Sequence, residues 1–280
     1  MEYVEAAFLQ KLKLPNKDSH KGQNGRLTIV GGSKLFHGAS LWALVVASRI
    51  VDMVYYASVV ENQKLVEHLE KNLYAFINIP LGKEADYITE SDAVLIGPGM
   101  VRGDANFTGT GETGEETKKT VLQLLKQFPD KKWVLDAGAL QVINPEVLQS
   151  LNQVIITPHH KEFKTLFELE AQDETIMQMA QTYNCTILLK GKVDTIVSPG
   201  GRVIYNQTGN EGMTKGGTGD VLAGLVAVLA CTNDLFTAAA AGAYINGLAG
   251  DKLYQTVGPL FNADDLAKIV PEILWQEIKK

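Results

Sequence analysis

A glycine-rich stretch in the last third of the chain holds the residues best suited to chemistry. Residues 209–224 contain six glycines, and an apolar run follows from Val221 to Leu229. This pattern predicts a flexible loop that leads into the N-terminus of a buried helix. Exposed backbone N–H groups and the partial positive charge of a helix N-terminus both favour a bound phosphate or a developing anion. We therefore expect an anion-binding site in this stretch.

One carboxylate, Asp220, lies where the glycine-rich loop meets the predicted helix. A carboxylate beside an anion site does not attract the anion, so Asp220 either caps the helix or accepts a proton. Capping is the common role of an aspartate before a helix. A cap alone does not need so many glycines, which cost conformational entropy on folding. Both roles stay open at this point.

The composition of the 280 residues, of which 45% are hydrophobic, predicts a large folded core. No linker interrupts the pattern, so residues 1–280 are expected to form a single domain. A net charge of −6 without a basic cluster argues against nucleic-acid binding. Cys185 and Cys231 lie in apolar sequence, which is typical of buried thiols in a reducing compartment. With neither a signal peptide nor an apolar stretch of about eighteen residues, we expect a cytoplasmic protein without membrane partners.

Short apolar runs alternate with amphipathic or apolar helical patterns along the chain, which is typical of a parallel sheet covered by helices. Many of these runs end in glycine, proline or a polar residue, and open α/β sheets bind ligands at that edge. The sequence therefore predicts an α/β fold with three layers. Strands are expected at residues 26–30, 53–56, 74–77, 93–96, 133–135, 154–156 and 186–189, with a hairpin over 195–197 and 203–205.

Two common phosphate-binding motifs do not account for the glycines. The P-loop requires a glycine, four residues and then Gly-Lys-Ser/Thr, which residues 212–219 do not supply. A dinucleotide-binding fingerprint requires a third glycine after the first strand, and only Gly31-Gly32 is present. The anion site must therefore belong to another class of protein.

Several motifs occur in an order that resembles a known family. The glycine-rich stretch Gly209-Asn210-x-Gly212-Met213-x-x-Gly216-Gly217-Thr218-Gly219-Asp220 is preceded by a series of shorter matches, namely Lys21-Gly22-x-x-Gly25, Val30-Gly31-Gly32-Ser33, Gly38-Ala39, Ile96-Gly97-Pro98-Gly99, Leu135-Asp136-Ala137, Thr157-Pro158-His159 with Glu162, and Leu189-Lys190-Gly191. The set is similar to that of the ADP/ATP-dependent NAD(P)H-hydrate dehydratases, which are carbohydrate-kinase-like relatives of ribokinase. The match spans about residues 20–250, nearly the whole chain.

The resemblance implies a ribokinase-like α/β/α fold and a role in repairing nicotinamide nucleotides. Such enzymes dehydrate the S form of hydrated NADH or NADPH at the expense of ADP or ATP. Hydroxide is a poor leaving group, so the ring hydroxyl is first phosphorylated and phosphate then departs. Phosphoryl transfer depends on positioning and charge stabilisation, and it implies Mg²⁺, whose ligands are not evident in the sequence. ADP and ATP are equally compatible with these residues.

The same resemblance assigns roles to individual residues. Asp220 would take the proton from the substrate hydroxyl, and it would have to be ionised to do so. Three roles are possible for Asp136: it caps a helix, it holds magnesium through water, or it simply ends its strand. The anion hole would comprise Gly216, Gly217, Thr218 and Gly219; the nucleotide would contact Lys190, Gly191, Lys192, Val193, Asp194 and Gly219; and the hydrated dinucleotide would contact Ala39, Gly99, Gly103, His159, Asn210 and Asp220.

The sequence departs from the family pattern at two places. Met100-Val101-Arg102-Gly103 replaces the usual Leu-Gly, and a polar segment follows that we expect to be a surface loop over residues 100–117. His160 replaces a residue that is commonly proline. An epimerase domain is not expected within this chain, so the R-to-S epimerase would be a separate protein. The resemblance also implies a homo-oligomer, either a dimer or a tetramer.

Two other functions remain possible from the residues alone. A small-molecule kinase of the ribokinase superfamily, acting on a vitamin precursor, would share the glycine-rich anion hole and the aspartate. Asn210, Met213 and the segment Thr157-Pro158-His159 favour the dehydratase over that kinase. A nucleotide-sensing module without turnover would keep the glycines but would not need a proton acceptor such as Asp220.

Overall fold

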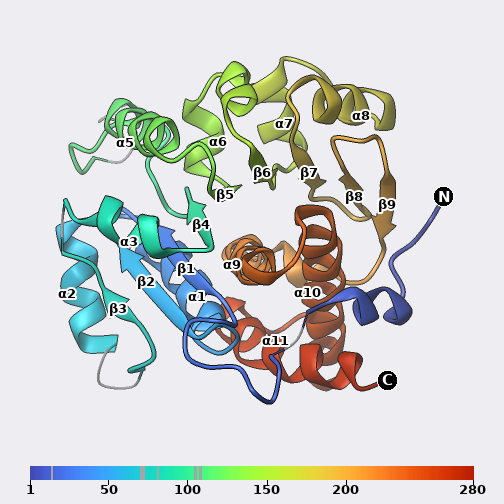
Figure 1. The fold of residues 1–280 in the computed structure, drawn as a ribbon. Helices are drawn as coiled ribbons and strands as arrows, with labels where there is room; N and C mark the ends of the chain where they lie inside the picture. Colours follow the sequence, from blue (N-terminus) through green and yellow to red (C-terminus); the bar gives the residue numbers. More distant parts are fainter. Residues whose placement is uncertain (14, 70–72, 81, 104–105, 107–108) are drawn as a thin grey trace.

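The computed structural model describes residues 1–13, 15–69, 73–80, 82–103, 106 and 109–280. These residues form one nine-stranded sheet in the order β3-β2-β1-β4-β5-β6-β7-β8-β9 (Figure 1). Neighbouring strands from β3 to β7 are parallel, whereas β8 and β9 continue the sheet antiparallel. The strands are β1 (Arg26–Val30), β2 (Met53–Ala57), β3 (Ile77–Asn78), β4 (Ala93–Ile96), β5 (Lys132–Leu135), β6 (Gln153–Ile156), β7 (Thr186–Leu189), β8 (Asp194–Val197) and β9 (Val203–Asn206).

Helices cover both faces of the sheet (Figure 1). The first face is packed by α1 (His37–Ala47), α9 (Thr218–Thr232), α10 (Leu235–Val257) and α11 (Ala263–Ile278). The second face is packed by α3 (Glu84–Glu90), α5 (Gly114–Gln127), α6 (Gly138–Val142), α7 (His160–Phe167) and α8 (Asp173–Thr182). The remaining helical segments are α2 (Val60–Leu69) and the 3₁₀ helices η1 (Ala6–Lys11), η2 (Pro145–Ser150) and η3 (Glu211–Thr214). The predicted three-layer α/β/α architecture is confirmed.

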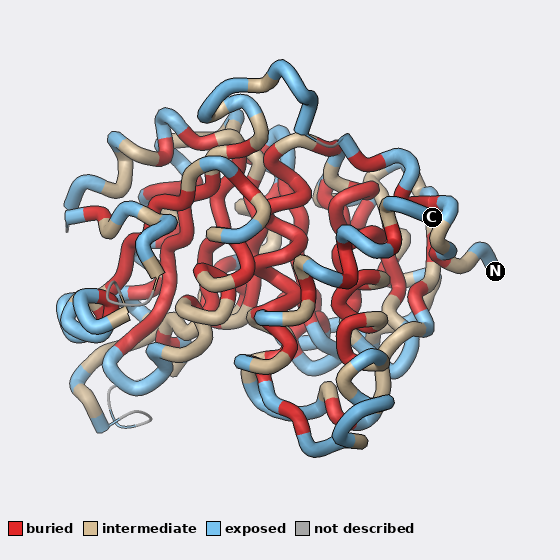
Figure 2. The backbone as a smooth tube through the Cα atoms, turned by 90° about the horizontal axis from the view of Figure 1, so that it is seen from below, coloured by how far each residue is buried: buried red, intermediate tan, exposed pale blue. Residues whose placement is uncertain are grey.

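The central strands are apolar on both sides because each side meets a helical layer. In β4, Ala93 and Leu95 join the core on the α9 face, whereas Val94 and Ile96 join the core on the opposite face. All four side chains are fully buried. Figure 2 shows this burial as continuous red segments through the middle of the molecule. Near-continuous apolar runs in the sequence therefore indicate strands in the centre of the sheet.

Glycines allow the helices of the α9 face to approach one another closely. A Cβ on Gly224 of α9 would lie 2.7 Å from the Cα of Ala43 in α1. A Cβ on Gly242 of α10 would lie 2.6 Å from a methyl group of Val226. Side chains at these points would push the helices apart. The close packing holds α9, and the loop before it, firmly against the sheet.

Two expected elements differ in position from the prediction. The strand expected at residues 74–77 is wrong: the strand there is β3, Ile77–Asn78, which pairs only with Tyr55 and Tyr56 of β2. An edge strand can pair with only one other strand, so its length and position depend on that strand. The local sequence pattern does not show this dependence. The surface loop expected over residues 100–117 ends earlier than predicted: α5 begins at Gly114, because Thr113 and Glu116 form a reciprocal capping box.

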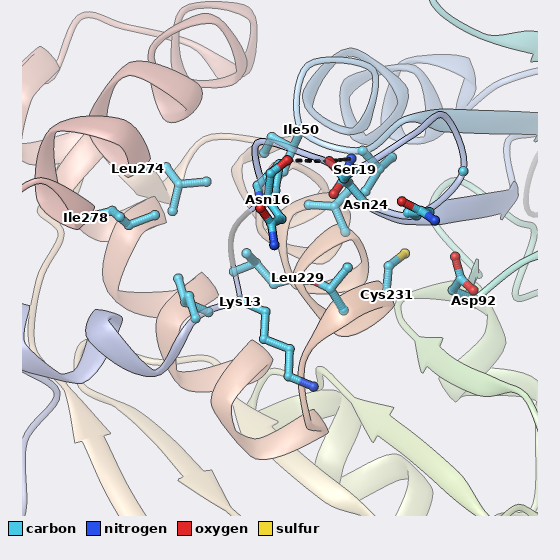
Figure 3. A pocket seen from close by; sticks show the side chains of 17 residues that line it. Lys13, Asn16, Ser19, Asn24, Ile50, Asp92, Leu229, Cys231, Leu274 and Ile278 are labelled. Carbon is cyan, nitrogen blue, oxygen red and sulfur yellow. Dashed lines mark hydrogen bonds between the residues drawn. The ribbon is translucent and has the colours of Figure 1, made fainter.

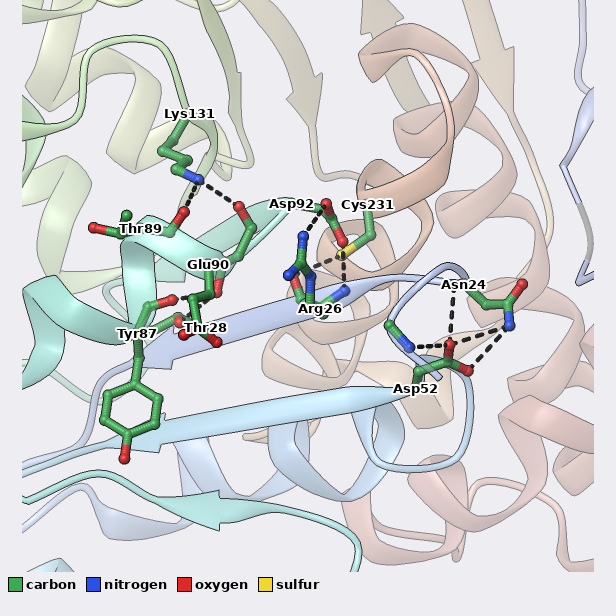
Figure 4. A network of polar contacts seen from close by, with 12 residues as sticks. Asn24, Arg26, Thr28, Asp52, Tyr87, Thr89, Glu90, Asp92, Lys131 and Cys231 are labelled. Carbon is green, nitrogen blue, oxygen red and sulfur yellow. Dashed lines mark hydrogen bonds and ion pairs between the residues drawn. The ribbon is translucent and has the colours of Figure 1, made fainter. Parts of the chain in front are cut away.

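A polar network secures the loop before β1 at the N-terminal edge of the sheet (Figure 4). Asp92 accepts a hydrogen bond from the backbone N–H of Arg26 at 2.8 Å, and its carboxylate lies 3.5 Å from the Arg26 guanidinium. Asp52 accepts hydrogen bonds from the N–H groups of Gly22 and Asn24 at 2.8 and 3.0 Å. These carboxylates fix the loop by pairing its backbone donors, which is a structural role.

A cavity of about 480 Å³ adjoins this network and is lined partly by Leu229 and Cys231 at the C-terminal end of α9 (Figure 3). Burial raises the pKa of the Cys231 thiol, and burial raises the pKa of Cys185 to about 12. Both cysteines are buried free thiols, as predicted. A thiol that stays protonated is a poor nucleophile, so neither group is suited to catalysis.

Candidate functional site

The C-terminal ends of β5, β6 and β7 bring three polar side chains together. Lys190, directly after β7, places its Nζ 2.8 Å from Oδ1 of Asp136, directly after β5. Thr157, which follows β6, donates its hydroxyl to the same Asp136 oxygen at 2.8 Å. Asp136 is only 1% exposed. Adjacent parallel strands deliver their ends to the same edge, so residues far apart in sequence form one buried ion pair.

The N-terminus of α9 faces this ion pair. A Cβ on Gly219, in the first turn of α9, would lie 3.6 Å from Nζ of Lys190. Among the residues that the structure describes, none accepts a hydrogen bond from the N–H of Gly219. A free N–H at a helix N-terminus and a nearby ammonium group are together suited to binding phosphate oxygens. The predicted anion site is therefore supported by geometry that the sequence did not show.

Asp220 follows Gly219 and has a strongly perturbed pKa. Desolvation by burial raises the pKa of Asp220 to about 7; the Asp136 and Glu162 carboxylates act in the same direction, whereas Lys190 opposes them. Burial acts to lower the pKa of Lys190, but Asp136, Glu162 and Asp220 raise it above its ordinary value. Lys190 is therefore a stable cation, and Asp220 exchanges its proton near neutral pH. A carboxylate with such a pKa is suited to general base catalysis.

The glycine-rich loop is shaped by Gly217, which is the N-cap of α9 and has φ +97°. A Cβ at this position would lie 2.4 Å from the ring of Trp42. Thr218 donates its hydroxyl to the carbonyls of Met213 and Lys215 at 2.6 and 3.0 Å. The Thr218 side chain therefore holds the loop together. Its backbone and the three neighbouring glycines remain the predicted anion hole.

We expect Gly217→Ala to destabilise the protein by about 1–3 kcal/mol, because it combines a positive φ with overpacking against Trp42. Gly216→Ala is the matched control, since Gly216 has no positive φ and a Cβ there would meet no atom within 4 Å. The free energy of unfolding of both variants is measured by denaturant titration. Equal stabilities of the two variants would contradict the loop geometry.

Two of the predicted substrate contacts lie side by side. A Cβ on Gly99 would lie 3.1 Å from the Cβ of Ala39 and 3.1 Å from the Cα of Gly32. Gly103 lies farther along, where its carbonyl accepts a hydrogen bond from the N–H of Gly114 at 2.5 Å. Residues 104, 105, 107 and 108 of the expected surface loop lie outside the described residues. The binding roles of Ala39, Gly99 and Gly103 stay predictions.

His159 is the N-cap of α7. Its Nδ1 accepts a hydrogen bond from the N–H of Glu162 at 3.2 Å, and the Glu162 carboxylate accepts from the N–H of His159 at 3.0 Å. Glu162 is 5% exposed and also accepts from Gln141 at 2.9 Å. The His159 side chain is about half exposed. The structure shows the capping role, and the predicted contact with the dinucleotide remains a prediction.

Asn210 also has a structural role, as the N-cap of η3. Its Oδ1 accepts from the N–H of Gly212 at 3.0 Å, and its Nδ2 donates to Asp251 at 2.9 Å. Asp251 additionally accepts from the N–H of Gly209 at 3.0 Å. Asp251 was not among the predicted site residues, although it is an isolated carboxylate in the helical stretch of small residues that follows residue 237. Substrate binding by Asn210 stays a prediction.

A cavity of about 910 Å³ opens beside Lys190 and Gly219. Asp194 at its edge accepts from the N–H of Gly191 at 3.0 Å and from Asn206 at 3.0 Å, while burial raises its pKa. The Asp194 carboxylate therefore fixes the loop, and its own contact with a nucleotide stays a prediction. All six residues predicted to contact the nucleotide line this cavity: Lys190, Gly191, Lys192, Val193, Asp194 and Gly219.

Neither a preformed metal cluster nor a membrane span is found in the part of the chain that the structure describes. Three or more histidine, cysteine, aspartate or glutamate side chains never converge there as metal ligands would. The described helices are too short or too polar to cross a membrane. Mg²⁺ is often held by one or two carboxylates together with substrate phosphates and waters, so the Asp136 carboxylate beside an anion site is a suitable donor.

A comparison with protein families identifies the chain. Residues 27–272 match the model of the NAD(P)H-hydrate dehydratase family. This chain belongs to that family. The predicted resemblance is confirmed, and the ribokinase-like fold is confirmed by solved structures of the same architecture.

Individual relatives agree with this membership of the dehydratase family. An ADP-dependent (S)-NAD(P)H-hydrate dehydratase of Cenarchaeum symbiosum is 35% identical over 270 residues, which are 92% of this chain and 91% of that protein. A bifunctional NAD(P)H-hydrate repair enzyme of Methanocaldococcus jannaschii is 37% identical over 95% of this chain. This chain spans about half the length of such bifunctional relatives.

Among solved structures, the ADP/ATP-dependent NAD(P)H-hydrate dehydratase of Bacillus subtilis, co-crystallised with ATP and Mg²⁺, has a TM-score of 0.81. The two sequences are 24% identical, and the match covers 99% of this chain and 98% of the Bacillus subtilis chain. At this identity the likeness shows the fold. The dehydratase fold therefore extends over essentially the whole of this chain.

Proposed function

We propose that this protein dehydrates the S form of hydrated NADH or NADPH, using ADP or ATP as phosphoryl donor. The observation that carries the proposal is the position of Asp220, beside the N–H of Gly219 and the Lys190 ammonium. The membership of the dehydratase family supports the same reaction. A proton acceptor next to an anion site is the arrangement that phosphorylation of a hydroxyl group requires.

In the proposed reaction, the Asp220 carboxylate accepts the proton of the ring hydroxyl as that oxygen attacks the terminal phosphorus of the nucleotide. The bond from phosphorus to the bridging oxygen breaks, which releases AMP from ADP or ADP from ATP. The amides of the glycine-rich loop and the Lys190 ammonium stabilise the charge of the transferring group. Phosphate then leaves the ring, a ring proton is lost, and the reduced nicotinamide is restored.

A divalent ion, which we propose to be Mg²⁺, fits the Asp136 carboxylate of this site. When bound to the nucleotide phosphates it supplies charge neutralisation during phosphoryl transfer. Asp136 is the residue that would hold it. Oδ1 of Asp136 is engaged by Lys190 and Thr157, whereas its second carboxylate oxygen has no hydrogen bond among the described residues. That second oxygen suits a water-mediated contact with the ion.

The activity is tested by adding ADP or ATP to hydrated NADH in the presence of the protein and following absorbance of the reduced nicotinamide. We expect absorbance to recover with formation of one phosphate per NADH. A superfamily kinase acting on a vitamin precursor would give no recovery. Comparing ADP with ATP, and hydrated NADH with hydrated NADPH, identifies the donor and the preferred substrate.

We further propose that the protein acts in the cytoplasm as a homo-oligomer. The R epimer of the hydrate would reach it through a separate epimerase. Sedimentation of the purified protein tests the oligomeric state. Activity on racemic hydrate should stop near half conversion unless an epimerase is added, apart from slow spontaneous epimerisation.

We expect kcat/KM to rise with pH to a plateau, with an apparent pKa of about 7. Asp220 acts as a base only when ionised, and burial raises its pKa to about 7. Activity is therefore lost as pH falls through that value and is retained above it. The rate is measured between about pH 6 and pH 8, with the melting temperature recorded at each pH as the control. A flat profile over this range would exclude Asp220 as the group that titrates.

A further inference from the structure

One amide side chain in the candidate nucleotide cavity lacks the hydrogen bonds that buried polar groups normally make. Asn246 of α10 lines the cavity and is only 4% exposed. Its Oδ1 is buried and has no hydrogen-bond partner. Nor does any residue in the described ranges hydrogen-bond to its Nδ2. Most buried polar side chains are paired, so an unpaired amide at the wall of a cavity is a candidate contact for a bound ligand.

The position of Asn246 relative to the anion site indicates which part of a ligand it meets. Gly219 and Lys190 mark the end of the cavity that suits phosphate. Leu222, one turn farther along α9, and Ala243, one turn before Asn246 on α10, give the cavity an apolar wall. A phosphate-binding end next to an apolar wall with one amide matches a nucleotide, whose base is flat, largely apolar and polar along its edge.

The chemistry of the amide selects among the bases. A carboxamide presents one acceptor and two donors, and rotating it by 180° exchanges the oxygen and nitrogen positions. The edge of adenine that carries N6 and N7 is complementary to the amide, because the N6 amino donor lies beside the N7 acceptor. On the same edge, hypoxanthine and guanine present two acceptors, O6 and N7, so the amide oxygen stays unpaired in either orientation of the carboxamide. Such a mismatch is a strong basis for discrimination.

We propose that Asn246 recognises the adenine base of the phosphoryl donor and thereby makes the enzyme selective for adenine nucleotides. This inference rests on the proposed function, because it assigns the nucleotide to the cavity beside Lys190. It assigns nucleotide specificity to a residue of α10, whereas the glycine-rich loop leads into α9. The amide completes its hydrogen bonds only when adenine is bound.

The test compares binding of ADP and inosine diphosphate, which differ at position 6 of the base, by titration calorimetry. We expect the wild-type protein to bind ADP about tenfold more tightly than inosine diphosphate. In Asn246→Leu, which keeps a similar volume, the two affinities should become nearly equal through loss of ADP affinity. Asn246→Ala is a second variant that removes the amide without adding bulk.

Gln255→Leu is the matched control, because Gln255 lies on the same helix but is exposed to solvent. It should keep the wild-type preference. A preference for ADP that survives in both Asn246 variants would overturn the role of Asn246. Wild-type protein that binds the two nucleotides equally would overturn base recognition while leaving the proposed dehydratase intact. Wild-type protein that binds neither nucleotide would overturn the proposed function as well.

Discussion

Asp220→Asn is expected to lower kcat by about 10³-fold, because it removes the proton acceptor but keeps the shape of the side chain. Nucleotide affinity should change little, since Gly219 and Lys190 remain in place. Turnover is measured by recovery of reduced nicotinamide, and ADP binding by titration calorimetry. Wild-type turnover in this variant would contradict the assignment of Asp220.

The same substitution should stabilise the folded protein at neutral pH. Burial raises the pKa of Asp220 from its ordinary value of 3.8 to about 7, so its ionisation opposes folding. The penalty begins above about pH 4 and is complete above about pH 7, where it amounts to at most roughly 4 kcal/mol. Asp86→Asn is the control, because Asp86 is 70% exposed on the surface of α3. An inactive yet more stable Asp220 variant would exclude unfolding as the cause.

Lys190→Met is expected to destabilise the protein by about 3–5 kcal/mol, because it leaves the buried Asp136 carboxylate without its partner. ADP affinity should also fall by about 10- to 100-fold through the loss of a charged contact with phosphate. Because Lys190 holds the pKa of Asp220 down, any residual activity should require a higher pH. Denaturant titration, calorimetry and the pH profile measure these three effects.

The double variant Lys190→Met with Asp136→Asn separates stability from function. Replacing the unpaired carboxylate by a neutral amide should restore much of the lost stability. It should not restore ADP affinity, because the ammonium group is still missing. If the double variant were no more stable than the single one, the ion pair would not be the reason for the stability loss.

Local sequence patterns predicted the architecture well where burial dominates. Residues 93–96 form a wholly apolar run. A strand that is covered on both faces needs that composition, so the sequence predicted a central position for β4. The edge strand β3 was placed wrongly because its register depends on Tyr55 and Tyr56 of β2, which are more than twenty residues away. Long-range pairing leaves little trace in the composition of a two-residue strand.

For the site, the sequence distinguished the loop but not the roles of the single residues within it. Asp136 was open between three roles, and the structure shows it in a buried ion pair with Lys190. The structure shows His159 and Asn210 as helix caps, a role that involves only residues close to them in the sequence. Asn246 gave no signal, because one amide in an alanine-rich helix is unremarkable until its surroundings are known.

The sequence by itself determined the fold class, the family and the glycine-rich loop ending in Asp220, because motif order and apolar periodicity are properties of the chain. Only the tertiary structure decided that Lys190 pairs with Asp136, and that the pKa of Asp220 rises to about 7. Those properties depend on distance and burial, which arise when strands separated by more than fifty residues end at one edge of the sheet. Asp220 is therefore marked as a candidate base by its environment as much as by its motif.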